Sequence, residues 1–237
     1  MSRLATLFVL ALSFGSYVRV QSDETAVPQV LCLVDSFQKN QVVTPAGKEL
    51  KGKAKMVFPK VEVYDTGSAL ERIEEILDSG EWDMIYLSFG LGDLFYKDPG
   101  TREIRAMSKF SGGVRVTSPE QYEENLSRLT RRLRATGAKV IWGHTTPLIS
   151  GETSKGPYRN FQENLFDGGS PADYNAIASR VMKREEIPIV DLHRHVMEHF
   201  EGDERHPPFN GYAKALSGKK APLHTPLVEE ILEVLDR

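Results

Sequence analysis

The sequence is poor in the residues that mark several classes of protein. A single cysteine among 237 residues, Cys32, cannot form a disulfide within the chain, which excludes a disulfide-stabilised scaffold. Lysine and arginine number 30 against 33 aspartate and glutamate residues, so the chain has no excess of positive charge with which to bind nucleic acid. Internal repeats and low-complexity segments are also absent. What remains is the ordinary composition of a globular protein.

Long hydrophobic runs are equally scarce, and the one that stands out lies at the N-terminus. Arg3 precedes an apolar run over residues 4–14, which is followed by small residues. The run is shorter than the roughly 20 residues that span a bilayer, and this arrangement is typical of a secretory signal peptide. We therefore predict a cleavable signal over residues 1–22, with cleavage after Gly15 or near Ser22, rather than a buried N-terminal helix. The protein is then secreted or periplasmic, with no stable membrane span.

Strand and helix signals alternate along the rest of the chain, which is the pattern of a mostly parallel sheet covered by helices. Short apolar runs predict five strands, and apolar stripes with capping residues predict the helices between them. The predicted strands are Val30–Val34, Lys60–Tyr64 together with Met56–Phe58 before it, Asp83–Phe89, Ala138–Trp142 and Ile187–Leu192. The predicted helices are Ser68–Ser79, Ser118–Gly137, Ser170–Arg184 and Pro226–Leu235. We predict one α/β domain over residues 26–237.

Polar or glycine-rich turns follow the predicted strands. Ligands of an open parallel sheet bind at the carboxyl ends of the strands, so these turns are expected to meet at one edge. The turns carry Asp35-Ser36, Asp65-Thr66-Gly67, Gly90-Leu91-Gly92-Asp93 and His144 after the first four strands, and His224 just before the last helix. A serine, backbone N–H groups of glycine-rich turns and a histidine are the parts that acyl transfer needs.

The order of these turns resembles the sequence blocks of the SGNH/GDSL hydrolases. Within that family the chain is most similar to a group of secreted bacterial SGNH hydrolase-type proteins, through Phe-Gly-Leu-Gly-Asp-Leu at 89–94, Gly-Gly-Val-Arg-Val-Thr-Ser-Pro-Glu-Gln-Tyr at 112–122 and the His-x-Pro turn at 224–226. The resemblance covers nearly the whole chain after the signal. It implies a three-layer α/β/α, flavodoxin-like fold with a five-stranded, mostly parallel sheet.

The resemblance also implies a serine esterase that uses neither a cofactor nor a metal. Ser36 would be the nucleophile, His224 the base that removes its proton, and the backbone N–H groups of Ser36 and Gly67 the donors to the oxyanion. The substrate would be a carboxylic ester, such as an O-acyl carbohydrate or a small ester. The long irregular stretches Leu94–Thr117 and His199–Leu223 would form the floor of its pocket.

Three positions depart from the family's pattern. Val34 replaces the glycine before Asp-Ser, Gly92 falls where the third block has an asparagine, and Ala221 falls where an acid precedes the histidine. The His224 ring would then be oriented by a backbone carbonyl, Asp191 or Asp203. A scaffold that binds a glycan or a lipid ester without turnover is the alternative function.

Each candidate site residue also has a structural interpretation. Ser36 could cap the first helix, and Asp35 is expected to hold the turn around it. Asp93 is expected to hold the third loop, and His144 to make a structural hydrogen bond. The three glycines of the turns, Gly67, Gly90 and Gly92, could serve to allow positive φ.

A cluster of histidines near residue 195 invites a metal-dependent interpretation. His195 and His199 are four residues apart, as on one face of a helix, and His193 lies close by. No glutamate follows His195 directly, as the zinc-protease pattern requires. A solvated or partly packed helix is therefore the better interpretation of these residues.

Overall fold

The computed structural model describes residues 27–35, 38–94, 96–100, 107, 109–147, 171–199 and 221–237. Five parallel strands form one sheet in the order β2-β1-β3-β6-β7. These strands are β1 (Gln29–Val34), β2 (Lys55–Val57), β3 (Met84–Ser88), β6 (Lys139–Gly143) and β7 (Ile189–Val190). Because all pairings are parallel, the strands end at one common edge, which we call the carboxyl edge.

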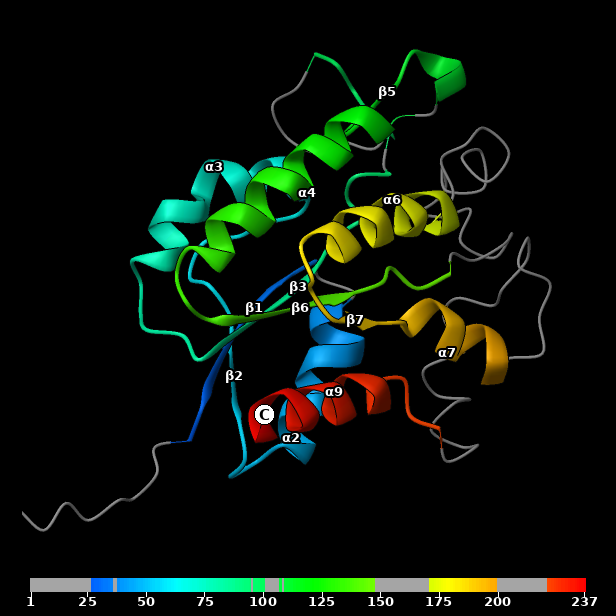
Figure 1. The fold of residues 1–237 in the computed structure, drawn as a ribbon. Helices are drawn as coiled ribbons and strands as arrows, with labels where there is room; N and C mark the ends of the chain where they lie inside the picture. The colour runs from blue at the N-terminus through cyan, green and yellow to red at the C-terminus, as the bar shows by residue number, and fades with distance from the viewer. Residues whose placement is uncertain are drawn as a thin grey trace, which may run out of the picture.

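Helices cover both faces of this sheet (Figure 1). One face carries α3 (Thr66–Leu77), α4 (Pro119–Arg134) and α6 (Pro171–Arg184), and α4 packs between the other two. The opposite face carries the short η1 (Lys39–Val43) with α2 (Thr44–Glu49), and α9 (Thr225–Asp236) packs against α2. The helix α7 (Leu192–His199) follows β7. The predicted three-layer α/β/α architecture with a parallel five-stranded sheet is therefore confirmed.

The strands β1 and β3 form the middle of the hydrophobic core. All residues of β3 and all but the first of β1 are buried, as expected of strands covered on both faces. Cys32 is among them, and burial raises the pKa of its thiol far above the usual range. This cysteine therefore behaves as a small core residue, not as a reactive thiol.

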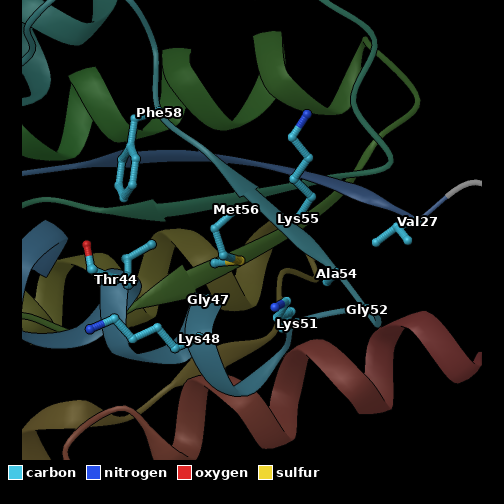
Figure 2. Close-up of a pocket in the computed structure, with 11 residues that line it drawn as sticks. Val27, Thr44, Gly47, Lys48, Lys51, Gly52, Ala54, Lys55, Met56 and Phe58 are labelled. Atoms are coloured by element: carbon cyan, nitrogen blue, oxygen red, sulfur yellow. The ribbon is translucent and has the colours of Figure 1, made fainter.

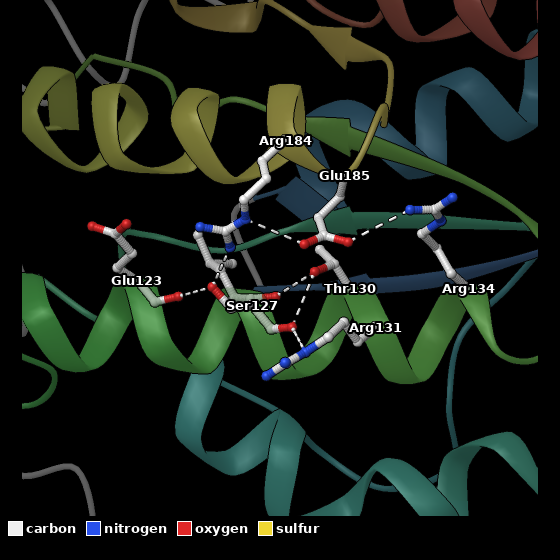
Figure 3. A network of polar contacts seen from close by, with 8 residues as sticks. Glu123, Ser127, Thr130, Arg131, Arg134, Arg184 and Glu185 are labelled. Carbon is white, nitrogen blue, oxygen red and sulfur yellow. Dashed lines mark hydrogen bonds and ion pairs between the residues drawn. The ribbon is translucent and has the colours of Figure 1, made fainter.

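The helix α4 begins and ends as its sequence predicts. The hydroxyl of Ser118 accepts a hydrogen bond from the backbone N–H of Gln121, and Pro119 occupies the first helical position. Gly137 follows the helix with φ +83°, the left-handed conformation that a glycine adopts without steric cost. Exposed polar contacts join the outer surface of α4 to the end of α6 (Figure 3). Arg184 donates to the hydroxyl of Ser127 at 2.7 Å, and Arg134 lies 3.5 Å from Glu185, the residue after α6.

Two sequence predictions about the fold are wrong. The second strand is Lys55–Val57, and Lys60–Tyr64 forms no strand but the approach to α3. In addition, the stretch Leu94–Thr117 is not wholly irregular, because β4 (Tyr96–Lys97) and β5 (Val114–Arg115) pair as a short antiparallel ribbon and η2 (Lys109–Ser111) lies between them. Among the helices within the described residues, none is long and apolar enough to cross a bilayer.

Candidate active site at the carboxyl edge of the sheet

The turn after β1 is held by Asp35, as predicted. The side chain of Asp35 is buried, and its Oδ1 accepts a hydrogen bond from the backbone N–H of Gln38 at 2.9 Å. Its backbone carbonyl accepts from the N–H of Lys39, also at 2.9 Å. Ser36, the predicted nucleophile, lies outside the described residues, so its distance from His224 stays a prediction.

The carboxamide of Gln38 is buried without a hydrogen-bond partner among the described residues. The residue is 1% exposed, and neither Nε2 nor Oε1 bonds to any of them. Burying an amide in this way costs free energy, so such groups are rare in folded proteins. Gln38 is not among the predicted site residues, and only its place two residues after Ser36 points to it in the sequence.

The first turn of α3 presents one free backbone N–H at the carboxyl edge. Asp65 caps the helix, and its Oδ1 accepts from the N–H of Ser68 at 2.8 Å. The N–H of Thr66 donates to the carboxylate of Asp93 at 3.1 Å. The N–H of Gly67, between these two, has no acceptor among the described residues. An N–H at a helix start with no acceptor is suited to bind a negative charge, and the oxyanion role of Gly67 stays a prediction.

Asp93 ties this first turn to the loop after β3. Its buried carboxylate accepts from both the backbone N–H and the hydroxyl of Thr66, the latter at 2.5 Å. The amide of Asn125 donates to the same hydroxyl at 3.0 Å. Burial and the charge of Asp65 raise the pKa of Asp93 to about 7, against the hydrogen bonds that it accepts. Asp93 therefore holds the turn that carries Gly67, and not only its own loop as predicted.

Gly92 is a glycine because the backbone of Tyr64 lies too close to it to leave room for a side chain. A Cβ at this position would lie 1.8 Å from the backbone oxygen of Tyr64. A Cβ on Gly90, which has φ +149°, would lie 2.2 Å from the hydroxyl of Thr145. Positive φ thus explains Gly90 but not Gly67 or Gly92, for which that prediction is wrong. Gly92 also leaves no room for the side-chain oxyanion donor of the family's third block.

His144 is fastened through both ring nitrogens. Its Nδ1 lies 3.0 Å from Oδ1 of Asp191, and its Nε2 lies 2.9 Å from the hydroxyl of Ser179. Since a carboxylate only accepts, Nδ1 carries the proton in the neutral ring and Nε2 accepts from Ser179. The predicted structural hydrogen bond of His144 is confirmed, and the suggestion that Asp191 orients His224 is wrong.

Asp191 is ionised in this arrangement. Its partial burial acts to raise the pKa, but hydrogen bonds from His144 and from the backbone N–H of Arg194, with the charges of both groups, lower it to about 2. Ser179 was missed by the sequence analysis. Ser179 follows by one helical turn Asn175, whose side chain bonds the backbone of Thr145 on the same side of α6, and this contact between distant segments has no local sequence signal.

His224 lies just before α9, and Nε2 of its ring lies 3.0 Å from Oε2 of Glu49 at the end of α2. The helical run of η1 and α2 begins after β1 at the carboxyl edge, and Glu49 comes at its far end, roughly 15 Å along the run from Gln38. The predicted position of His224 beside Ser36 at the carboxyl edge therefore stays a prediction.

Glu49 supplies an acid where the sequence has none. Ala221, at the position of the family's acid, is buried, and its backbone oxygen lies 3.4 Å from Nε2 of His195. That nitrogen is 3.1 Å from the oxygen of Pro222, so α7 fixes the segment that leads to His224. The Glu49 pairing spans 175 residues of sequence, which is why no local pattern revealed it. Asp203, the other candidate partner, lies outside the described residues.

The neighbouring histidines contact the backbone and each other. The ring of His199 bonds through Nδ1 to the backbone oxygen of His195 at 2.9 Å, and the two rings lie 4.5 Å apart. Within the described part of the chain, no three His, Cys, Asp or Glu side chains are grouped so as to hold a metal ion.

Comparison with known proteins gives matches among solved structures only. No family model and no curated protein sequence matches the chain. The acetyl xylan esterase AlAXEase matches with TM-score 0.53 and 15% identity over 72% of this chain and 80% of its own. The psychrotrophic esterase EstA from Pseudoalteromonas sp., in a structure inhibited by monoethylphosphonate, matches with TM-score 0.53 and 12% identity over 89% of this chain and 100% of its own. A GDSL-like lipase from Bacteroides thetaiotaomicron matches with TM-score 0.52 and 14% identity over 86% and 89%.

At this level of identity the matches concern the fold. The resemblance drawn from the sequence is confirmed to that extent: the chain has the fold of the SGNH/GDSL-like esterases and acylhydrolases.

Proposed function

We propose that the protein is a serine esterase that cleaves a carboxylic ester through an acyl-enzyme. The hydroxyl of Ser36 attacks the carbonyl carbon while His224 takes its proton, and the alcohol leaves with that proton. Water then attacks the acyl group with His224 again as base, and the carboxylic acid is released. An O-acyl carbohydrate or a small ester is the proposed substrate class, supported by the named activities of the acetyl xylan esterase and the esterase of like fold.

The observation that carries the proposal is the N–H of Gly67 at the carboxyl edge, which has no acceptor among the described residues. Thr66 and Ser68 on either side use their N–H groups within the protein, and Asp93 fixes the turn. A donor that is held in place before the reaction stabilises the oxyanion at little reorganisation cost. Removing one such donor typically lowers kcat about 10²–10³-fold.

Beside the backbone N–H groups of Gly67 and Ser36, a side-chain oxyanion donor is needed because Gly92 has no side chain. The buried carboxamide of Gln38 is our candidate, since its Nε2–H groups have no partner among the described residues and it follows Ser36 by two positions. Binding an oxyanion would satisfy that amide, which explains why a buried polar group is kept there.

Glu49 is our candidate for the acid that supports His224. In the serine–histidine–acid arrangement the acid bonds one ring nitrogen and the nucleophile faces the other. Glu49 bonds Nε2, so proton transfer from Ser36 uses Nδ1, or uses Nε2 after Glu49 moves to the other nitrogen. The side chain of Glu49 is 55% exposed, which leaves room for such a movement.

A fluorophosphonate probe and an activated acetyl ester test the proposal. We expect the probe to label Ser36, and the variant Ser36→Ala to lose both label and turnover. Ser179→Ala is the matched control, because Ser179 also bonds a histidine backed by an aspartate but is not proposed to react. Label on Ser179, or unchanged turnover in Ser36→Ala, contradicts the proposal.

The alternative is a binding protein that has lost turnover. The missing donor at Gly92 and the exposed pairing of His224 with Glu49 favour it. It predicts saturable binding of an acylated glycan that Ser36→Ala leaves intact, with no turnover of any ester. The same pair of variants therefore separates the two functions.

Secretion is part of the proposal and has its own test. Residues 1–22 lie outside the described residues, and their sequence alone supports a signal peptide. Expression of the full chain in a bacterium should give an exported protein whose first residue lies between 16 and about 23. Export without cleavage, or retention in the cytoplasm, contradicts this part.

A further inference from the structure

A pocket lies on the outer side of the edge strand β2, beside the end of α2 that also carries Glu49. It has a volume of about 550 Å³, which is within the range of small-molecule sites. Its lining residues come from α2, from the turn after it and from β2, with Val27 ahead of β1: Val27, Val43, Thr44, Gly47, Lys48, Lys51, Gly52, Ala54, Lys55, Met56 and Phe58 (Figure 2).

The charged residues of this pocket are all positive. Lys48, Lys51 and Lys55 belong to the lining, and no aspartate or glutamate does. None of the three ammonium groups makes an ion pair or a hydrogen bond with a side chain among the described residues. In a chain with more acids than bases, this one-sided rim indicates a negatively charged ligand.

The rest of the lining is apolar. Val43 and Ala54 are fully buried below the surface, and Met56 and Phe58 are partly buried against the core. Val27 leaves 41% of its surface exposed at the side of the pocket. An apolar floor under a cationic rim suits a ligand that has an alkyl chain and an anionic head.

A peptide fits this surface less well than an alkyl chain. The edge strand β2 has only three residues, so it offers few main-chain groups to an added strand. Met56 at the centre is a flexible side chain that adapts to the shape of an apolar ligand.

We propose that this pocket binds a single-chain alkanoate, the anion of a fatty acid. The alkyl chain packs against Met56 and Phe58 above the buried Val43, and the carboxylate lies at the rim beside Lys51. The site is independent of the proposed esterase activity. It opens at the amino end of the sheet, where Lys55 pairs with Gln29 at the start of β1.

Calorimetric titration of the whole protein with octanoate, decanoate and decanol tests the ligand class. We expect one decanoate per chain, bound more tightly than octanoate by up to about 4-fold for each added methylene that is buried. Decanol, with the same chain and no charge, should bind about 5-fold or more weakly than decanoate. Equal affinities for octanoate and decanoate, or for decanoate and decanol, overturn the proposal.

Variants of the lysines test the position of the carboxylate. Lys51→Glu is expected to weaken decanoate binding about 5-fold or more, because it puts a negative charge at the rim. Lys53→Glu is the matched control, since Lys53 is exposed in the same turn but does not line the pocket. Equal weakening by both variants would indicate a general charge effect and overturn the site.

A filling variant tests the alkyl chain's position without touching a charge. A Cβ on Gly47 would lie 3.1 Å from Cγ of Met56, so Gly47→Leu places a side chain in the pocket. Leucine favours the helix that contains residue 47, so the variant should fold. We expect it to abolish decanoate binding. Decanoate bound as before in folded Gly47→Leu, or binding to anionic phospholipid vesicles but not to monomeric decanoate, overturns the proposal.

Discussion

Two histidines of the candidate site differ in how they are held. His144 is 8% exposed and both of its ring nitrogens are bonded, to Asp191 and to Ser179. Among the described residues His224 has one such partner, Glu49, which is 55% exposed. A histidine that must move a proton needs a ring nitrogen that can meet the substrate or the nucleophile. The comparison favours His224 as the reactive histidine and His144 as part of the frame.

The same contrast divides the candidate site into two sides. Residues 89–93, 144–147 and 191 form a fastened side, where turns touch through buried hydrogen bonds and close backbone approaches. The open side comprises Asp35 and Gln38 around the expected position of Ser36, together with the end of α2, where the half-exposed Glu49 meets His224. A rigid frame beside groups that can adjust is the usual arrangement of catalytic sites.

The largest effect is expected on the fastened side, from Gly92→Ala. The added Cβ would lie 1.8 Å from the oxygen of Tyr64, so one of two buried turns must move. We expect the free energy of unfolding, measured in urea, to fall by about 3–5 kcal/mol. Gly137→Ala is the control, because its Cβ would meet nothing within 4 Å and only the positive φ is strained. It should cost about 1 kcal/mol. Equal costs would show that the two turns are not packed as described.

The two histidines should separate stability from activity. His144→Ala leaves the partly buried Asp191 carboxylate and the Ser179 hydroxyl without their partner, and we expect it to cost about 2–3 kcal/mol in unfolding free energy. His224→Ala removes an exposed pairing and should cost less than about 1 kcal/mol. Turnover of an activated acetyl ester should show the opposite order, with His224→Ala inactive. Loss of activity in His144→Ala alone would reverse the assignment.

The fold could be predicted because its signals are local. The apolar runs that became β1, β3 and β6 and the Ser118–Pro119 start of α4 each specify an element within a few residues. The error at β2 has a physical reason. The apolar residues Val61 and Val63 alternate as in a strand, but the chain there passes Gly92 on its way to α3 and leaves the sheet. Tertiary contacts overrode the local pattern.

The site was predicted less completely because its contacts are not local. Gly67 and His224 could be found from their positions after a strand and before a helix. The pairing of His224 with Glu49 and that of His144 with Ser179 depend on which helices cover which face of the sheet, which periodicity does not determine. That the Gln38 amide has no partner among the described residues depends on how the surrounding side chains pack, and no sequence pattern predicts it.

The pH dependence of stability distinguishes two acids of the fastened side. The pKa of Asp93 is raised to about 7 in the folded protein, against about 4 in the unfolded chain. Between these values the folded state holds more protons, so stability falls as the pH rises from 4 to 7, by up to about 1.4 kcal/mol per unit. Asp191 has its pKa lowered to about 2, so its contribution is lost as the pH falls from 4 to 2.

Substitution of Asp93 and of Asp191 by asparagine tests the predicted direction of each acid's effect on stability as the pH changes. Asp93→Asn keeps the oxygen that accepts from Thr66 but cannot ionise, so urea unfolding should lose its slope between pH 4 and 7. Asp191→Asn should leave that slope and reduce the loss below pH 4. An unchanged slope in Asp93→Asn would mean that Asp93 is ionised throughout this range.

On the open side, Gln38→Leu should stabilise the protein while it reduces activity. Leucine is similar in size and removes a buried amide that has no partner among the described residues, so we expect a gain of about 1 kcal/mol in unfolding free energy. If Gln38 is the side-chain oxyanion donor, kcat for an activated ester falls about 10²-fold or more with little change in KM. Unchanged kcat in a stabilised Gln38→Leu would remove Gln38 from the site.

The smallest change in stability is expected from Glu49→Gln. The carboxylate of Glu49 is 55% exposed, so the loss of its charge should alter the unfolding free energy by less than about 0.5 kcal/mol. Glu75→Gln is the control, because Glu75 is an equally exposed acid paired with Arg72 far from the edge. In the proposed mechanism Glu49 stabilises the protonated ring that forms during attack, so kcat should fall about 10-fold in Glu49→Gln and not in Glu75→Gln. KM should be unchanged in both, since neither residue is proposed to touch the bound ester. Equal kcat values in Glu49→Gln and in the unchanged protein would mean that His224 works without an acid. Ser36 and His224 would then act as a serine–histidine dyad.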